Sequence, residues 1–182
     1  MALTRFACDK YASVELNHVA FRKTGAIISQ TPLGEAFTEA EPCENGMWLS
    51  ADISAGVLSA VAAKGPVGVV YTVEKEYAYN DVGLKNHKSV AGQYPRVGIL
   101  VAGDVITSNC FQYDTTEFAN VAALEEALKA AAETAVFVVG VVGNAVPKLT
   151  ANAPTGVPYG KVVKYYTMPN GEKGIKYQMI EA

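Results

Sequence analysis

Tyr94-Pro-Arg-Val-Gly-Ile-Leu-Val-Ala-Gly-Asp-Val-Ile-Thr-Ser-Asn109 is the stretch with the clearest strand–turn–strand pattern in the chain. Apolar β-branched residues alternate along its first half, at Val97, Ile99 and Val101. After Gly103-Asp104 a second β-rich run begins at Val105. We therefore predict a β-hairpin with one face toward a core. An aspartate that follows glycine in such a turn is explained by turn chemistry, so we assign Asp104 no catalytic role.

Four further strands are expected before this stretch, over residues 13–17, 26–29, 47–53 and 67–73. In the third of them, Leu49 and Ala51 share one face, and Trp48 and Ser50 take the other. Residues 1–12 show no clear period. We interpret them as an N-terminal arm that becomes ordered only against a partner.

One amphipathic helix is predicted over residues 120–134. Apolar residues recur there at helical spacing, at Val121, Leu124, Leu128 and Ala131. Asn120 is suited to cap the helix, because its side chain can accept a hydrogen bond from an otherwise unpaired backbone N–H. The apolar run from 135 to 142 follows and is predicted to be a strand covered on both faces.

The C-terminal part of the chain is predicted to be a hairpin attached by a linker. Residues 147–160 are rich in proline and glycine, which is typical of a linker. Residues 161–182 contain two β-rich runs around Pro169-Asn170-Gly171, a strong hairpin signal. Simple alternation places Lys164 and Tyr166 on one side of the first run and Lys161 on the other.

These elements together predict a mainly β (α+β) fold. The chain divides into an arm (1–12), a β-rich body (13–146), a linker (147–160) and a terminal hairpin (161–182). The body is expected to be a β-sandwich or a barrel with one amphipathic helix. Its 182 residues fit one domain that can bury a core without disulfides or metals.

Composition excludes several classes of protein. Half of the residues are hydrophobic, but no apolar run approaches the roughly 20 residues that span a bilayer. The first ten residues lack the apolar stretch of a secretory signal, so we expect a protein that stays soluble inside the cell that makes it. The net charge of −3 is too balanced to indicate a nucleic-acid binder.

The distribution of charge is more informative than its sum. Residues 24–63 contain no lysine or arginine, and they carry the acidic residues Glu35, Glu39, Glu41, Glu44 and Asp52. The last part of the chain is predominantly basic. Surfaces of opposite sign can meet between neighbouring copies and steer their assembly. The alternative is that both are ordinary solvated faces.

Seven residues are candidates for contacts with a partner. Tyrosines are enriched at interfaces, and three of them flank or occupy a predicted surface loop over residues 74–92. Trp48 is the only tryptophan and is expected to be a core or interface anchor. The terminal hairpin contributes the rest. The candidates are Trp48, Tyr77, Tyr79, Tyr94, Lys161, Lys164 and Tyr166.

No catalytic, cofactor-binding or metal-binding residues are assigned. Gly140-Val-Val-Gly143 lacks the remaining features of a dinucleotide fingerprint, and His18 and His87 have no metal-ligand spacing. A Cys/His or Ser/His catalytic pair, for example Cys43 with His87, could form only if the two residues approach in space. The three cysteines, Cys8, Cys43 and Cys110, are expected to be reduced thiols. Their odd number leaves open a disulfide between subunits.

The region from Glu44 to Cys110 resembles the bacteriophage capsid decoration, or auxiliary head, proteins. The resemblance is carried by Glu44-Asn45-Gly46-Met47, Tyr71-x-x-Glu74-Lys75-x-Tyr77, Tyr94-Pro95-Arg96-Val97-Gly98 and Gly103-Asp104-x-Ile106-Thr107-x-Asn109. It implies a non-enzymatic virion protein, made in the host cytoplasm, that decorates or cements the capsid exterior. The implied partners are the major capsid protein and copies of the chain itself, without nucleic acid, membrane or cofactor.

Three other functions remain as alternatives. A phage tail-tube subunit would also be a β-sandwich with a flanking helix and a long loop. A small-molecule-binding β-barrel would bind a metabolite. An unrecognised hydrolase would depend on Cys43 or His87.

Overall fold

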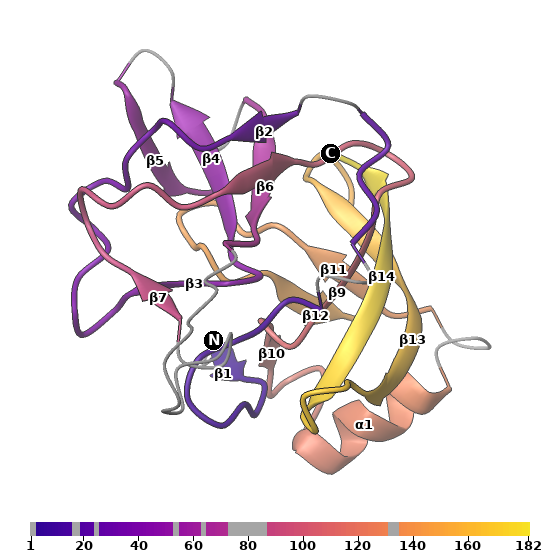
Figure 1. Cartoon of the computed structure of the whole chain (residues 1–182). Helices are drawn as coiled ribbons and strands as arrows, with labels where there is room; N and C mark the ends of the chain where they lie inside the picture. Colours follow the sequence, from indigo (N-terminus) through magenta and orange to yellow (C-terminus); the bar gives the residue numbers. More distant parts are fainter. Residues whose placement is uncertain are drawn as a thin grey trace.

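The computed structural model describes residues 3–15, 19–23, 26–52, 55–62, 65–72, 87–130 and 135–182. These residues form a seven-stranded sheet, a five-stranded sheet, a two-stranded sheet and one helix. Figure 1 shows the five-stranded sheet at the upper left and the seven-stranded sheet, with the helix beside it, at the lower right. The mainly β fold with one helix confirms the predicted fold class.

The seven-stranded sheet joins segments from both ends of the chain. All of its neighbouring pairs are antiparallel except β10 and β12, which are parallel. Its strands, in spatial order, are β1 (Leu3–Arg5), β10 (Gln112–Asp114), β12 (Lys148–Thr150), β11 (Phe137–Val139), β13 (Tyr159–Thr167), β14 (Lys173–Glu181) and β9 (Val105–Ser108).

The five-stranded sheet comes from residues 27–99 and is antiparallel throughout. Its strands, in spatial order, are β2 (Ile27–Ile28), β8 (Val97–Ile99), β6 (Val67–Val70), β4 (Trp48–Asp52) and β5 (Val57–Ala60). The two-stranded sheet pairs β3 (Cys43–Glu44) with β7 (Lys88–Ser89).

Two apolar cores lie on the two faces of the five-stranded sheet. Trp48 and Val69 belong to the larger core, which also contains Phe111 and Tyr177 from the seven-stranded sheet and its connections. Leu49 and its neighbours belong to the smaller core. The predicted alternation along β4 is therefore confirmed, and each face of that strand meets a different core. Burial on both faces makes this sheet a rigid centre for the molecule.

The predicted hairpin in residues 94–109 is wrong, although both of its strands form. β8 pairs with β2 and β6 in the five-stranded sheet, whereas β9 pairs with β14 in the seven-stranded sheet. The segment between them carries the chain from one sheet to the other. Asp104 is fully buried at this corner, where its carboxylate accepts hydrogen bonds from the backbone N–H groups of Val101 and Arg22. Alternation predicts extended backbone, but it does not determine which strand becomes the partner.

The predicted helix is confirmed as α1 (Val121–Lys129). The Asn120 side chain accepts a hydrogen bond from the backbone N–H of Ala123, and Leu124 and Leu128 are buried. Residues 131–134, where the predicted helix ended, lie outside the described residues. No helix in the part of the chain that the structure describes has the length and hydrophobicity needed to cross a membrane.

The arm and the linker differ from the predictions, because each contains a strand. Leu3–Arg5 of the arm pairs with β10 and is followed by Phe6, which is buried in the larger core. The arm is therefore ordered within a single chain. Lys148–Thr150 of the predicted linker forms β12, the third strand of the larger sheet. Three-residue strands leave little pattern in a sequence, and only their long-range pairing reveals them.

Candidate functional site

The terminal hairpin is confirmed, and it consists of β13 and β14, the two longest strands among the described residues. The chain reverses at Pro169-Asn170-Gly171, where Gly171 has a φ of 87° that favours glycine. Buried side chains alternate along β14 at Ile175, Tyr177 and Met179, which face the larger core. The intervening side chains consequently point away from the core and form the opposite face of the hairpin.

Two irregularities in the pairing shape that opposite face. Val162 pairs with Tyr177 and Lys164 with Lys176, so Val163 is an extra residue in β13. Glu181 pairs with Tyr159 and Met179 with Gly160, so Ile180 is likewise an extra residue in β14. β-bulges of this kind redirect side chains. Val163 is 55% exposed and Ile180 is 46% exposed, which is unusual for large apolar residues in this protein.

We call this surface the hairpin outer face. The bulge at Val163 places Lys161 on the same face as Lys164, with the buried Val162 between them. The prediction that Lys161 takes the side opposite Lys164 and Tyr166 is therefore wrong, because simple alternation does not account for an extra residue. The members of the face are exposed or half-buried: Lys161, Val163, Lys164, Tyr166, Lys176, Gln178 and Ile180.

The hairpin outer face is positively charged. Lys164 lies directly opposite Lys176 in the pairing of the two strands. Their ammonium groups lie 5.3 Å and 6.0 Å from the centre of the Tyr166 ring, within the range of cation–π attraction. The Tyr166 hydroxyl donates a hydrogen bond to the carboxylate of Glu15. Burial, together with this carboxylate, raises the pKa of Tyr166.

The other predicted contact residues do not join this face. Trp48 is fully buried, and its indole N–H donates to the Tyr177 hydroxyl at 3.1 Å. Trp48 is therefore a core anchor, and its place among the candidate interface residues is wrong. Tyr94 is 61% exposed but belongs to the segment between β7 and β8. That segment lies on the other side of the molecule from β13 and β14 (Figure 1). Tyr77 and Tyr79 lie outside the described residues.

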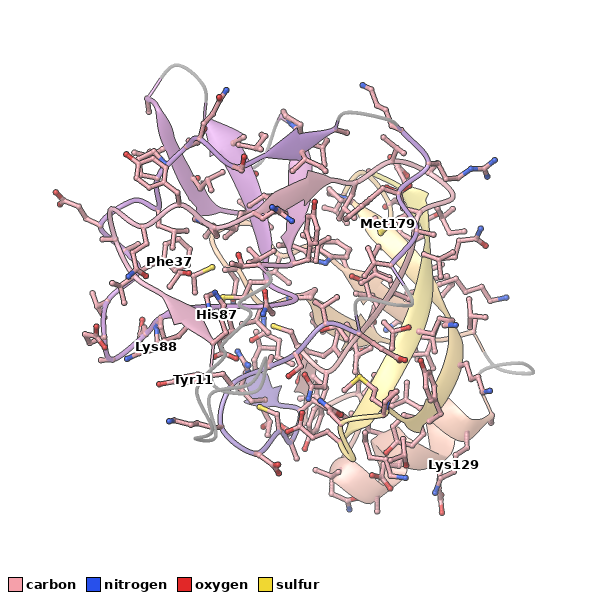
Figure 2. All side chains as sticks on the ribbon, viewed as in Figure 1. Tyr11, Phe37, His87, Lys88, Lys129 and Met179 are labelled. Carbon is pink, nitrogen blue, oxygen red and sulfur yellow. The ribbon has the colours of Figure 1, made fainter. Side chains whose placement is uncertain are left out.

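A second charged surface lies on that other side, in a segment that we call the acidic loop (residues 35–41). Glu35, Glu39 and Glu41 are exposed there, and Glu39 forms an ion pair with Lys88. Phe37 is buried and anchors the loop to the smaller core. Figure 1 shows β13 and β14 at the right of the molecule, and Figure 2 shows Phe37 and Lys88 at its left. The acidic loop and the hairpin outer face therefore cannot meet within one chain.

An open groove of about 820 Å³ separates the arm from the acidic loop and the segment before β12. Arg5 and Glu44 form an ion pair at 2.8 Å on its wall. Half-buried Cys8 and the apolar side chains of Phe37 and Met47 also line it. A groove of this size can admit a small molecule.

The geometry does not favour nucleophilic catalysis by the candidate pair of Cys43 and His87. Both residues are buried, and burial raises the pKa of the Cys43 thiol well above its ordinary value. The reactive form of cysteine is the thiolate, which burial disfavours. Cys110 is also buried, so Cys8 is the cysteine best placed for a bond with another subunit. Among the described residues, no three His, Cys, Asp or Glu side chains are grouped to hold a metal ion.

Comparisons of the chain with protein-family models, with curated proteins and with solved structures found no match.

Proposed function

We propose that this protein is a structural subunit of a bacteriophage virion, which decorates the capsid exterior through contacts with the major capsid protein and with copies of itself. The observation that carries the proposal is the hairpin outer face. Three of the predicted contact residues, Lys161, Lys164 and Tyr166, gather there with two exposed apolar side chains. Apolar anchors among polar residues are typical of a surface that binds other proteins.

The residues that carry the family resemblance support the body rather than the contact surface. Gly46 has a φ of 89°, and a Cβ atom at this position would lie 2.2 Å from the Ser108 Oγ. A Cβ atom at Gly98 would lie 2.2 Å from the Phe21 ring. Both positions need glycine for steric reasons. The resemblance therefore supports a shared β body, and the contacts that attach this protein to a shell are proposed to come from its own hairpin.

A single contact through the hairpin outer face is expected to be weak. Nine residues of strand extend for about 30 Å, and two strands are about 10 Å across, so the face is smaller than the roughly 800 Å² per partner of a stable interface. Many weak contacts that are engaged together bind far more firmly than one. A protein present in many copies on a repeating shell obtains this advantage.

The test is to mix the purified protein with undecorated capsids and to image the particles. Regular added density is expected. Val163→Asp should lower its occupancy, because the substitution places a charge at an apolar contact. Val142→Asp is the matched control, since Val142 is also 55% exposed but lies between β11 and β12. Capsids without added density, or equal occupancy for the two variants, would contradict the proposal.

Two alternatives have their own tests. A tail-tube subunit would form rings or tubes without capsids and would leave capsids bare. The groove beside the arm favours the small-molecule-binding alternative, which predicts a rise in melting temperature with a member of a metabolite panel. Neither bare capsids nor stabilisation by a metabolite is expected from a protein whose only ligands are proteins of the shell.

A further inference from the structure

Two lysines lie opposite each other on the hairpin outer face, and the repulsion between their charges destabilises the hairpin locally. Lys164 and Lys176 are directly opposite on neighbouring antiparallel strands. Like charges at such positions destabilise a sheet. The Tyr166 ring between them offsets part of this repulsion. An acidic group that approached the face from outside would remove more of it, so the arrangement favours an anionic partner.

The lysines of this face are available for such a partner. Within the described part of the chain, Lys161, Lys164 and Lys176 form no salt bridge. The acidic loop carries exposed carboxylates that are also without ion-pair partners among the described residues, at Glu35 and Glu41. Both sets are exposed and opposite in sign, which is the condition for electrostatic steering between proteins.

The acidic loop presents its glutamates on an ordered backbone. Phe37 is buried beneath the loop, and its carbonyl accepts a hydrogen bond from the backbone N–H of Ala91 at 2.8 Å. The backbone N–H of Glu41 donates to the Thr38 hydroxyl, which closes the end of the loop. An ordered loop loses less conformational entropy on binding than a free one. Exposed Ala36 and Ala40 lie between the glutamates and offer small apolar surface, as Val163 and Ile180 do on the hairpin outer face.

We propose that the hairpin outer face of one copy binds the acidic loop of a second copy, in a head-to-tail contact. The inference rests on the proposed function, because it names one partner of the same surface. The two surfaces lie on opposite sides of the molecule, so the contact is between different patches (Figure 2). Such contacts either close into a ring or continue as a filament. Both the decoration function and the tail-tube alternative allow such self-association, and binding to capsids distinguishes them.

Charge reversal provides a direct test in the absence of capsids. Sedimentation velocity of the wild-type protein should show association that increases with concentration in about 50 mM salt and falls in about 500 mM salt. The variant K161E/K164E makes both surfaces acidic, and the variant E35K/E41K makes both basic. Each variant alone should be monomeric. An equimolar mixture should associate again, because each surface then meets one of opposite sign.

Two controls separate this contact from general effects of charge and folding. Lys129→Glu changes an exposed lysine at the end of α1 and should leave association unchanged (Figure 2). Circular dichroism and thermal melting should show that every variant is folded. A wild-type protein that stays monomeric, or a mixture that does not associate, overturns the head-to-tail contact. Binding to capsids is measured separately, so its loss would overturn the proposed function instead.

Discussion

At the scale of single residues, one buried polar contact connects the two large sheets. Trp48 of β4 and Tyr177 of β14 are both fully buried, and their rings lie 6.0 Å apart. The indole N–H of Trp48 has the Tyr177 hydroxyl as its acceptor. A buried donor that loses its acceptor keeps its full desolvation cost. The stability of the packing between the two sheets therefore depends in part on the Tyr177 hydroxyl group.

We predict that Tyr177→Phe lowers the free energy of unfolding by about 1–3 kcal/mol, because it leaves the Trp48 N–H without this acceptor. Urea denaturation followed by the fluorescence of Trp48, the only tryptophan, measures the change. Tyr94→Phe is the matched control, since Tyr94 is largely exposed, and it should leave stability unchanged. Equal stability of the two variants would show that the hydrogen bond contributes nothing.

A second prediction at this scale concerns acid stability. Burial opposes ionisation of Glu117, but hydrogen bonds from the Lys148 ammonium, the Thr150 hydroxyl and the backbone N–H of Ala151 outweigh it. The pKa of Glu117 is consequently below its ordinary value of 4.5. A carboxyl group whose pKa is lower in the folded than in the unfolded state stabilises the native state at pH values above the unfolded pKa. This contribution is lost as the pH falls through the folded pKa.

We therefore expect the stability of the wild type to fall as the pH decreases from about 6 to about 3, and Glu117→Gln to reduce this fall by about 0.5–1 kcal/mol. The estimate is modest because the carboxylate is partly solvated. Urea unfolding at a series of pH values measures both slopes. Glu126→Gln, at an exposed position of α1, is the control. The same pH dependence of the unfolding free energy for wild type and Glu117→Gln would contradict the lowered pKa of Glu117.

At the scale of elements, the bulge at Val163 determines the composition of the hairpin outer face. Val162 and Lys164 keep regular partners on either side of it, so removal of the extra residue leaves the rest of the pairing in place. Tyr165 differs, because it faces the larger core and stacks edge-on against Phe6. Deletion of Tyr165 would instead bring a lysine to the position opposite Ile175.

Single-residue deletions test this description of β13. Deletion of Val163 should change the free energy of unfolding by no more than about 1 kcal/mol, because the ladder continues without a bulge. Deletion of Tyr165 should cost more than about 3 kcal/mol, because it removes an aromatic side chain from the core and turns a charge inward. Urea denaturation compares the two. Similar losses would show that the bulge itself is needed for the fold.

At the scale of the whole molecule, the N-terminal arm connects several distant parts of the chain. β1 adds to the edge of β10, and Phe6 enters the larger core. The Glu172 carboxylate accepts a hydrogen bond from the backbone N–H of Asp9. Its other oxygen accepts from the Asn109 side chain, so Glu172 links the arm to the hairpin turn. The arm is therefore expected to contribute to the stability of an isolated subunit.

We predict that Phe6→Ala lowers the free energy of unfolding by about 3–5 kcal/mol, as expected for a buried phenylalanine. Leu3→Ala, at a partly exposed position of β1, should cost less than about 1 kcal/mol. Urea denaturation at concentrations where the protein is monomeric measures both. A small effect of Phe6→Ala would support the original interpretation of the arm as a segment that becomes ordered only on a partner.

Local signals in the sequence predicted local structure well. Asn120 caps the helix because its side chain needs only a backbone N–H three residues away. Pro169-Asn170-Gly171 forms the hairpin turn because φ at Gly171 is positive. The candidate face was predicted in part, since Lys164 and Tyr166 were assigned to one side. Lys161 was also a candidate but was assigned to the other side, and the remaining members were missed, because the bulges that expose Val163 and Ile180 have no signal in the alternation.

The sequence by itself determined that the segments of β4, β6 and β14 are extended, where the helix begins and where the terminal hairpin turns, because these properties depend on neighbours within a few residues. Only the tertiary structure decided that β8 and β9 enter different sheets and that Trp48 is buried. It alone placed Lys161 beside Lys164 on one face. Strand pairing and burial depend on residues far apart in the chain, so their energies do not appear in any short stretch of sequence.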